Sequence, residues 1–351
     1  MSEVKGLRAR TTVFLLVAIV AAFTAARAGA RRQHDFDLSH CVIPREQIVS
    51  GGPGKDGIPA ITDPAVVPAS SAGYLRQDEP IIGVEVEGEA RAYPLRVLVW
   101  HENVNDTLGG QPIAVTYCPL CHSSVVFNRK VGGEVREFGI SGLLWNSNVL
   151  LYDRQRGSGK KESLWSQVGM RAVCGPAARR GLRLEALSSQ LLSWQRWRQR
   201  HPETTVLSLD TGFNRSYGSH PYEGYFQGDR LMFPVTSSTA QRRKFPNKEQ
   251  MVVLRVGERL KAYATSDIAR AAGKDDRMID RFAGAEVQFT YHRDTDRASV
   301  EITRKPEDGG QTAVAHMFWF AWKSVYPKAP VFTPAGDSGE EKGQDREREQ
   351  K

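Results

Sequence analysis

The sequence predicts an α+β fold built from duplicated β-β-α-β-β units, with mostly antiparallel sheets and a few packed helices. One observation behind this prediction is a series of short runs in which apolar and polar residues alternate between glycine-containing turns. Such alternation is typical of half-buried strands in hairpins. The other observation is that the pattern of residues 81–127 returns at residues 249–300. We therefore expect residues 81–330 to form one internally duplicated domain.

The first unit begins with a hairpin, which is followed by a helix and a second pair of strands. Pro94 is expected to begin the helix, because proline fits the first helical turn, and the pattern ends near Asp106. The next strand ends at Cys118. Between the two units, residues 186–200 are expected to form another helix, with leucine and tryptophan side chains along one side.

The second unit follows the first at a nearly constant distance. Tyr263 follows Tyr93 by 170 residues, and His292 follows Cys118 by 174 residues. The difference of four residues implies an insertion of four residues around the helix of the second unit. Because a histidine stands where the first unit has a thiol, we expect the chemistry in the first unit and a scaffold in the second.

The turn that joins the last two strands of the first unit carries the most informative motif. It reads Cys118-Pro119-Leu120-Cys121-His122 and lies between two apolar strands. Two cysteines at this spacing suit a reversible disulfide, half of a metal site, or covalent haem attachment. The haem interpretation is the weakest of these, because the motif lies in a hairpin turn and His122 would need a surface that covers a porphyrin.

A metal site requires ligands in addition to the two thiolates. A structural zinc ion takes four ligands and a catalytic zinc ion takes three, whereas thiolates also favour Cu(I). The candidate ligands are Cys118, Cys121, His101 and His122, and the candidate ions are zinc and Cu(I).

A redox site needs only the two cysteines and a neighbour that lowers the pKa of one thiol. The candidate catalytic residues are Cys118, Cys121, His101 and Glu102, because a nearby histidine can stabilise a thiolate. The 141–147 loop is expected to border them. Thiol–disulfide redox and soft-metal handling are the functions expected first. The alternative is a non-enzymatic binding or structural module in which a disulfide staples the turn.

The ends of the chain predict an exported protein. Residues 1–30 have a basic start, an apolar run and small-residue cleavage sites, as a signal peptide does, although an uncleaved N-terminal anchor is the alternative. The expected location is periplasmic or extracellular. Residues 31–80 are a Pro/Gly-rich arm, either ordered on the surface or flexible, and residues 334–351 are a charged tail expected to be disordered.

The composition restricts the partners. The formal net charge is +8, but the basic residues are scattered and no nucleic-acid-binding motif accompanies them, so nucleic acid is not an expected partner. A small molecule, a metal or a redox partner protein remains, with membrane contact only through an uncleaved N-terminal segment. Whether Cys41 and Cys174 pair is left open by the sequence.

Several motifs resemble one known family, the domain of unknown function 3179, whose members are mostly exported. The resemblance covers about residues 43–327, and it implies no defined activity. Some members are labelled selenoproteins, which implies that a cysteine position can carry a redox-active selenol. This chain departs from the family pattern at His122 and in having Cys41 and Cys174. The resemblance rests on Ser50-Gly51-Gly52-Pro53, Asp56-Gly57-Ile58-Pro59-Ala60, Ala92-Tyr93-Pro94-Leu95, Trp100-His101-Glu102, Asn105-Asp106, Val115-Thr116-Tyr117-Cys118-Pro119-Leu120-Cys121, Ser141-Gly142-Leu143, Asn146-Ser147, Tyr152-Asp153-Arg154-Gln155, Ser163-Leu164-Trp165-Ser166-Gln167 and Phe318-Trp319-Phe320-Ala321-Trp322.

Overall fold

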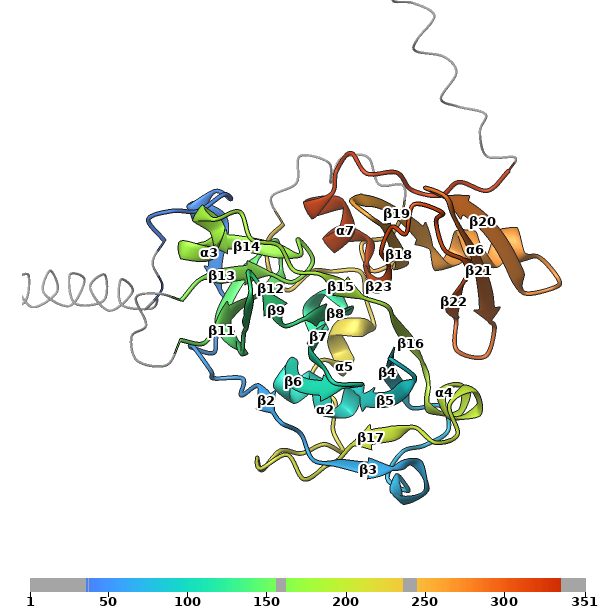
Figure 1. The fold of residues 1–351 in the computed structure, drawn as a ribbon, viewed down its shortest axis with the longest axis horizontal. Helices are drawn as coiled ribbons and strands as arrows, with labels where there is room; N and C mark the ends of the chain where they lie inside the picture. Colours follow the sequence, from blue (N-terminus) through green and yellow to red (C-terminus); the bar gives the residue numbers. More distant parts are fainter. Residues whose placement is uncertain (1–35, 37, 156–161, 236–244, 336–351) are drawn as a thin grey trace, which may run out of the picture.

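The computed structural model describes residue 36 and residues 38–155, 162–235 and 245–335. The expected signal peptide and nearly all of the expected tail lie outside these residues. The described chain is mostly β, with several sheets and few, short helices (Figure 1). The expected antiparallel pairing dominates, but the helices are shorter than the α+β prediction implied.

The largest sheet carries the cysteine turn. Its strand order is β19-β18-β23-β8-β7-β6-β2, and β15 also pairs with β8. All of these pairs are antiparallel except β2 with β6. The strands are β2 (Ile61–Thr62), β6 (Asn103–Leu108), β7 (Gln111–Cys118), β8 (Ser123–Asn128), β15 (Ala186–Leu187), β18 (Gln250–Val256), β19 (Arg259–Ala264) and β23 (Thr312–Phe318).

Two five-stranded sheets and two small sheets complete the β structure. One five-stranded sheet has the order β1-β11-β12-β13-β14, and the other has the order β16-β4-β5-β17-β3. The small sheets are β20-β21-β22 and β10-β9. Their strands are β1 (Ile48–Ser50), β3 (Val66–Pro68), β4 (Pro80–Val86), β5 (Glu89–Pro94), β9 (Lys130–Val131), β10 (Glu134–Val135), β11 (Phe138–Trp145), β12 (Asn148–Asp153), β13 (Leu164–Ser166), β14 (Arg171–Cys174), β16 (Ser189–Ser193), β17 (Thr205–Leu207), β20 (Arg277–Phe282), β21 (Ala285–His292) and β22 (Arg297–Arg304).

The helices are short and lie at the ends of strands. Most follow a strand directly, so that one face packs against a sheet while the chain reverses (Figure 1). In the described residues, none of them is long and apolar enough to cross a membrane. They are α2 (Leu95–His101), α3 (Pro176–Arg179), α4 (Trp194–Arg200), α5 (Glu223–Phe226), α6 (Thr265–Ala272) and α7 (Trp319–Val325), with the 3-10 turns η2 (Arg45–Gln47), η3 (Ala69–Ser71) and η4 (Pro119–Cys121).

Two of the expected helices are shorter than predicted. Helix α2 ends at His101, because Glu102 takes a left-handed conformation with φ of 56° and β6 follows at once. The residues expected as a helix over 186–200 form β15 and β16 first, and α4 begins only at Trp194. In both places pairing with a neighbouring strand, β7 or β4, overrides the local helical pattern.

The two predicted units have the same order of elements. The order β4-β5-α2-β6-β7-β8 is matched by β18-β19-α6-β20-β21-β22. The Tyr93 hydroxyl donates a hydrogen bond to Asp106 at 2.7 Å, and the Tyr263 hydroxyl donates to Asp280 at 2.7 Å. The sheets are assembled differently, however. Strands β18 and β19 join the largest sheet, whereas β4 and β5 belong to another.

The residues before the first unit contribute strands to three sheets. Strand β1 pairs with β11, β2 with β6 and β3 with β17. Cys41 forms a disulfide with Cys174 at the end of β14. Both cysteines belong to a small apolar cluster around Trp145 and Tyr152.

We expect the paired replacement Cys41→Ser and Cys174→Ser to lower the free energy of unfolding by about 2–5 kcal/mol, because the disulfide closes a long loop. The two cysteines are 133 residues apart in sequence. Denaturant unfolding without reductant measures the difference. Reduction of the unsubstituted protein is the control and should cause a similar loss, whereas an unchanged midpoint for the double variant contradicts this role.

Candidate functional site

The cysteine turn is a tight reversal between β7 and β8. Cys118 ends β7 and pairs with Ser123, the first residue of β8. Pro119 begins the 3-10 turn η4, and His122 closes it in the left-handed region with φ of 44°. This geometry places both cysteines on the same short turn.

Both thiols are buried and neither forms a disulfide. The exposed fractions are 1% for Cys118 and 0% for Cys121. The two side chains hydrogen-bond to each other. The Cys121 sulfur also lies 3.3 Å from the backbone carbonyl of Ser147, so its single proton can point to that carbonyl or, when Cys118 is ionised, to the Cys118 sulfur. The Cys121 sulfur therefore has polar contacts on two sides, with the turn itself and with the chain between β11 and β12.

The two thiols differ in acidity. Burial raises the pKa of a thiol, but the pKa of Cys118 falls below its ordinary value. The reason is that the Cys121 thiol and the backbone at Val149 and Leu120 hydrogen-bond to its sulfur. Burial, the hydrogen bond to Cys118 and the negative charge of Cys118 raise the pKa of Cys121 well above its ordinary value. Cys118 is therefore the thiol that ionises first.

A buried polar network supports the turn. The side-chain carbonyl oxygen of Gln167 accepts hydrogen bonds from the Ser123 hydroxyl at 2.6 Å and from the Asn148 side-chain amide at 2.8 Å. The Gln167 amide donates to the Thr116 hydroxyl at 2.9 Å. Asn148 in turn hydrogen-bonds to the Cys121 side chain. No local pattern connects Asn148 or Gln167 with the cysteines, although Gln167 belongs to the motif Ser163-Leu164-Trp165-Ser166-Gln167.

Glu102 lies near the thiols with its side chain buried. Its backbone carbonyl accepts a hydrogen bond from Tyr117 at 2.9 Å, which fixes the end of α2 beside β7. Burial raises the pKa of the Glu102 carboxyl well above its ordinary value, and the negative charge of Cys118 raises it further. Within the described chain, no hydrogen bond to this carboxyl is formed, so burial favours its neutral form.

His101 is committed to other partners. Its Nδ1 lies 2.7 Å from the Pro59 carbonyl, and its Nε2 lies 2.7 Å from the Tyr217 hydroxyl. Because a carbonyl only accepts, Nδ1 carries the proton and Nε2 accepts from Tyr217. Burial lowers the pKa of His101, in agreement with a neutral ring. Neither nitrogen has a lone pair left for a metal ion.

His122 contacts Tyr117 and aromatic side chains. Its Nδ1 lies 2.7 Å from the Tyr117 hydroxyl, and its ring packs against Phe226 and Phe318. Burial and the charge of Arg297 hold the pKa of His122 well below its usual range. The lowered pKa favours the neutral imidazole, which would not place a positive charge beside the thiols.

A cover segment, residues 208–235, lies across the whole site. The Tyr225 hydroxyl donates to the Leu120 carbonyl in the cysteine turn at 2.8 Å. The Ser147 hydroxyl donates to the Phe233 carbonyl at 2.8 Å. Tyr217 reaches His101 and Phe226 reaches His122, as described above. Figure 1 shows α5, which belongs to this segment, beside β7 and β8.

One protein-family model matches most of the chain. The family model described as a protein of unknown function (DUF3179) matches residues 55–329. The chain belongs to the DUF3179 family. Neither a curated protein nor a solved structure matches it significantly. The matched range includes every residue of the thiol site and Cys174, whereas Cys41 lies before it.

The geometry of this DUF3179 protein argues against two of the expected chemistries. In the described residues, no group of three or more His, Cys, Asp or Glu side chains converges to hold a metal ion. The set Cys118, Cys121, His101 and His122 therefore does not fit zinc, because His101 is engaged on both nitrogens. Covalent haem does not fit either, because both sulfurs are buried beneath the cover segment.

We expect Cys121→Ala to raise the pKa of Cys118 by about one unit or more, because a hydrogen bond to a charged group contributes roughly 1.5–3 kcal/mol. Cys121→Ser keeps a hydroxyl donor and should raise it less. The measurement is the thiolate ultraviolet absorbance as a function of pH, to which the disulfide-bonded cysteines do not contribute. Equal titration midpoints in all three proteins would show that Cys121 does not stabilise the Cys118 thiolate.

Proposed function

We propose that this DUF3179 protein performs thiol–disulfide exchange through Cys118 and Cys121. The observation that carries the proposal is the pair of adjacent reduced thiols, of which one has a lowered pKa and the other a raised pKa. This asymmetry suits a nucleophilic thiolate and a resolving thiol. The chain also contains an oxidised pair, Cys41–Cys174, so its two cysteine pairs differ in state.

The exchange proceeds in two balanced steps. The Cys118 thiolate attacks one sulfur of a partner disulfide, forms a mixed disulfide and releases the other partner sulfur as a thiolate, which takes up a proton. Cys121 then loses its proton and attacks the Cys118 sulfur, which releases the second partner thiolate. The partner gains two electrons and, by way of Glu102, the proton of Cys121, while its second thiolate takes up a proton from solvent; Cys118 and Cys121 become a disulfide. The reverse sequence oxidises a partner dithiol.

Glu102 suits the proton transfers of this sequence. The negative charge of Cys118 raises the pKa of the Glu102 carboxyl and so helps to keep that carboxyl protonated. Formation of the mixed disulfide removes that charge, so the pKa of Glu102 falls and its proton can pass to the departing thiolate. The resulting carboxylate can then accept the proton of Cys121. Glu102 thus acts as the general acid and base, whereas His101 positions the cover segment through Tyr217.

The alternative is a non-enzymatic module in which the cysteine pair only staples the turn. The near-complete burial of both sulfurs favours this alternative, because a partner disulfide must reach Cys118. Exchange therefore requires the cover segment to move. Many residues of the segment are exposed, but Tyr222, Phe226 and Phe233 pack against the core cluster. Opening therefore exposes apolar surface as well as breaking the hydrogen bond from Tyr225 to Leu120.

We also propose that the protein is exported, as its N-terminal sequence predicts. The Cys41–Cys174 disulfide is consistent with a location outside the cytoplasm, where disulfides persist. Cell fractionation with N-terminal sequencing should find a chain that begins near Gly29 or Arg31, or an anchored full-length chain. Recovery from the cytosol would contradict export.

We infer further that the two units arose by duplication. The support is their shared element order and the equivalent hydrogen bonds of Tyr93 and Tyr263. Strand pairing is also equivalent, since β6 with β7 and β20 with β21 pair in the same register, 174 residues apart. An experimental structure in which Cys118 and His292 fail to superpose would refute this inference.

We expect Cys118 and Cys121 to form a disulfide reversibly at a potential of about −270 to −120 mV, the range of thiol–disulfide enzymes. Mass spectrometry after equilibration with reduced and oxidised glutathione measures the loss of two hydrogens. Cys118→Ser is the control that removes this transition and leaves Cys41–Cys174 intact.

A staple would instead resist reduction down to below about −300 mV, and this result would favour the structural alternative. Failure of the pair to oxidise at any glutathione ratio would contradict the proposal. Retention of one Cu(I) ion per chain that blocks oxidation would assign the thiols to soft-metal handling.

We expect Tyr225→Phe to speed alkylation of Cys118 about fivefold, because the loss of one hydrogen bond worth about 1 kcal/mol favours opening of the cover segment. Tyr326→Phe is the matched control, since Tyr326 also donates to a backbone carbonyl, that of Val168 at 2.8 Å. The measurement is the rate of iodoacetamide labelling under reducing conditions. Equal acceleration in both variants would show a general loss of stability rather than opening over the thiols.

A further inference from the structure

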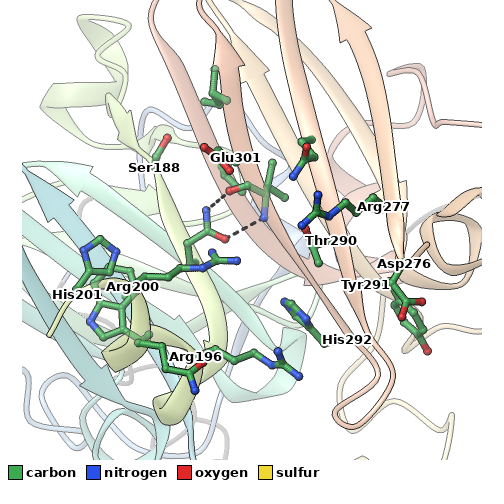
Figure 2. A pocket seen from close by; sticks show the side chains of 18 of the residues that line it. Ser188, Arg196, Arg200, His201, Asp276, Arg277, Thr290, Tyr291, His292 and Glu301 are labelled. Carbon is green, nitrogen blue, oxygen red and sulfur yellow. Dashed lines mark hydrogen bonds between the residues drawn. The ribbon is translucent and has the colours of Figure 1, made fainter. Parts of the chain in front are cut away.

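A separate polar groove lies between the two units. It has a volume of about 1210 Å³ and is lined by α4 and β16 on one side and by β21 and β22 on the other (Figure 2). None of the thiol-site residues lines it. The Gln190 side chain joins its two walls, because it donates to the Val300 carbonyl at 2.6 Å and accepts from the Val300 amide at 3.1 Å. The walls are therefore fixed before any ligand binds.

One end of the groove presents a neutral histidine, His292. Ser299 accepts a hydrogen bond from the Arg200 guanidinium at 3.0 Å and lies 2.9 Å from Nε2 of His292. The Ser299 oxygen has two lone pairs and one proton, so it can either donate to Nε2 or accept from it. Burial and the charges of Arg196 and Arg200 lower the pKa of His292 to about 4, so the ring is neutral. Its Nδ1 forms no hydrogen bond within the described chain.

Two arginines on α4 supply further donors at the same end. Arg196 and Arg200 are four residues apart and so share one face of the helix. Figure 2 shows their side chains extending toward the strands, where His292 lies. Arg196 donates through one nitrogen to Asp294 at 2.7 Å, but its Nε–H is buried and has no partner among the described residues. Arg200 keeps donors that are not used by Ser299.

The balance of charges indicates a ligand with a single negative charge. Arg196 is paired with Asp294 and Arg293 with Asp276. Arg200 has no carboxylate partner within the described residues, so this end has one uncompensated positive charge. Acidic residues such as Glu301 also line the groove and would repel a doubly charged anion.

We propose that Arg196, Arg200 and His292 form a binding site for the carboxylate group of a small ligand. Arg196 and Arg200 offer hydrogen-bond donors at this end of the groove, and guanidinium groups match the planar geometry of a carboxylate. His292 ends β21 just as Cys118 ends β7, so the second unit has a binding role at the corresponding position and not only a scaffold role. This site is independent of the thiol chemistry.

The test is an equilibrium titration of the full chain, followed by NMR, with N-acetylalanine and with its neutral analogue N-acetylalaninamide. The acid should bind at least tenfold more tightly than the amide, because a hydrogen bond between charged groups exceeds a neutral one by about this factor. Inorganic phosphate is titrated in parallel.

Arg200→Gln and Arg196→Gln should each weaken binding of N-acetylalanine about tenfold or more while the circular dichroism spectrum is unchanged. Arg198→Gln is the matched control, because Arg198 lies on the same helix over the ring of Trp194 and does not line the groove. Equal or undetectable binding of acid and amide, tighter binding of phosphate, or unchanged affinity in both groove variants would overturn the proposal.

Discussion

The burial of an ionisable sulfur is the constraint on which the rest of the site depends. A buried thiolate is costly unless hydrogen-bond donors face it, and Cys118 is supplied with such donors by its own turn and by Cys121. The cysteine turn also depends on Gln167, whose side chain hydrogen-bonds to Ser123 and Asn148. Because these side chains come from three different parts of the chain, the acidity of Cys118 is a property of the folded sheets. It is not a property of the motif alone.

This dependence explains which features the sequence could predict. Alternation of apolar residues predicts the strands on either side of the turn, and the family motifs identify the turn as the place of interest. Local patterns do not contain the partners of a side chain, however. Gln167 lies 44 residues from Ser123, and Pro59 lies 42 residues from His101. The prediction therefore placed His101 with the cysteines, whereas Pro59 and Tyr217 hold it.

The same reasoning applies to the helices. The pattern after Pro94 continues past His101, but Asn103 and Asn105 both donate to the Phe138 carbonyl, at 2.7 and 2.8 Å. These contacts hold β6 in an extended conformation beside β11, and propensity cannot compete with buried hydrogen bonds of this kind.

Trapping of a mixed disulfide tests the central claim most directly, because it detects the nucleophile itself. The Cys121→Ser variant lacks the resolving thiol, so attack by Cys118 on a small aromatic disulfide should leave a stable covalent adduct on Cys118. We expect this adduct in Cys121→Ser and none in Cys118→Ser. An adduct on Cys121 in the Cys118→Ser variant at an equal rate, or no adduct in either variant, would contradict the assignment of Cys118 as the reactive thiolate.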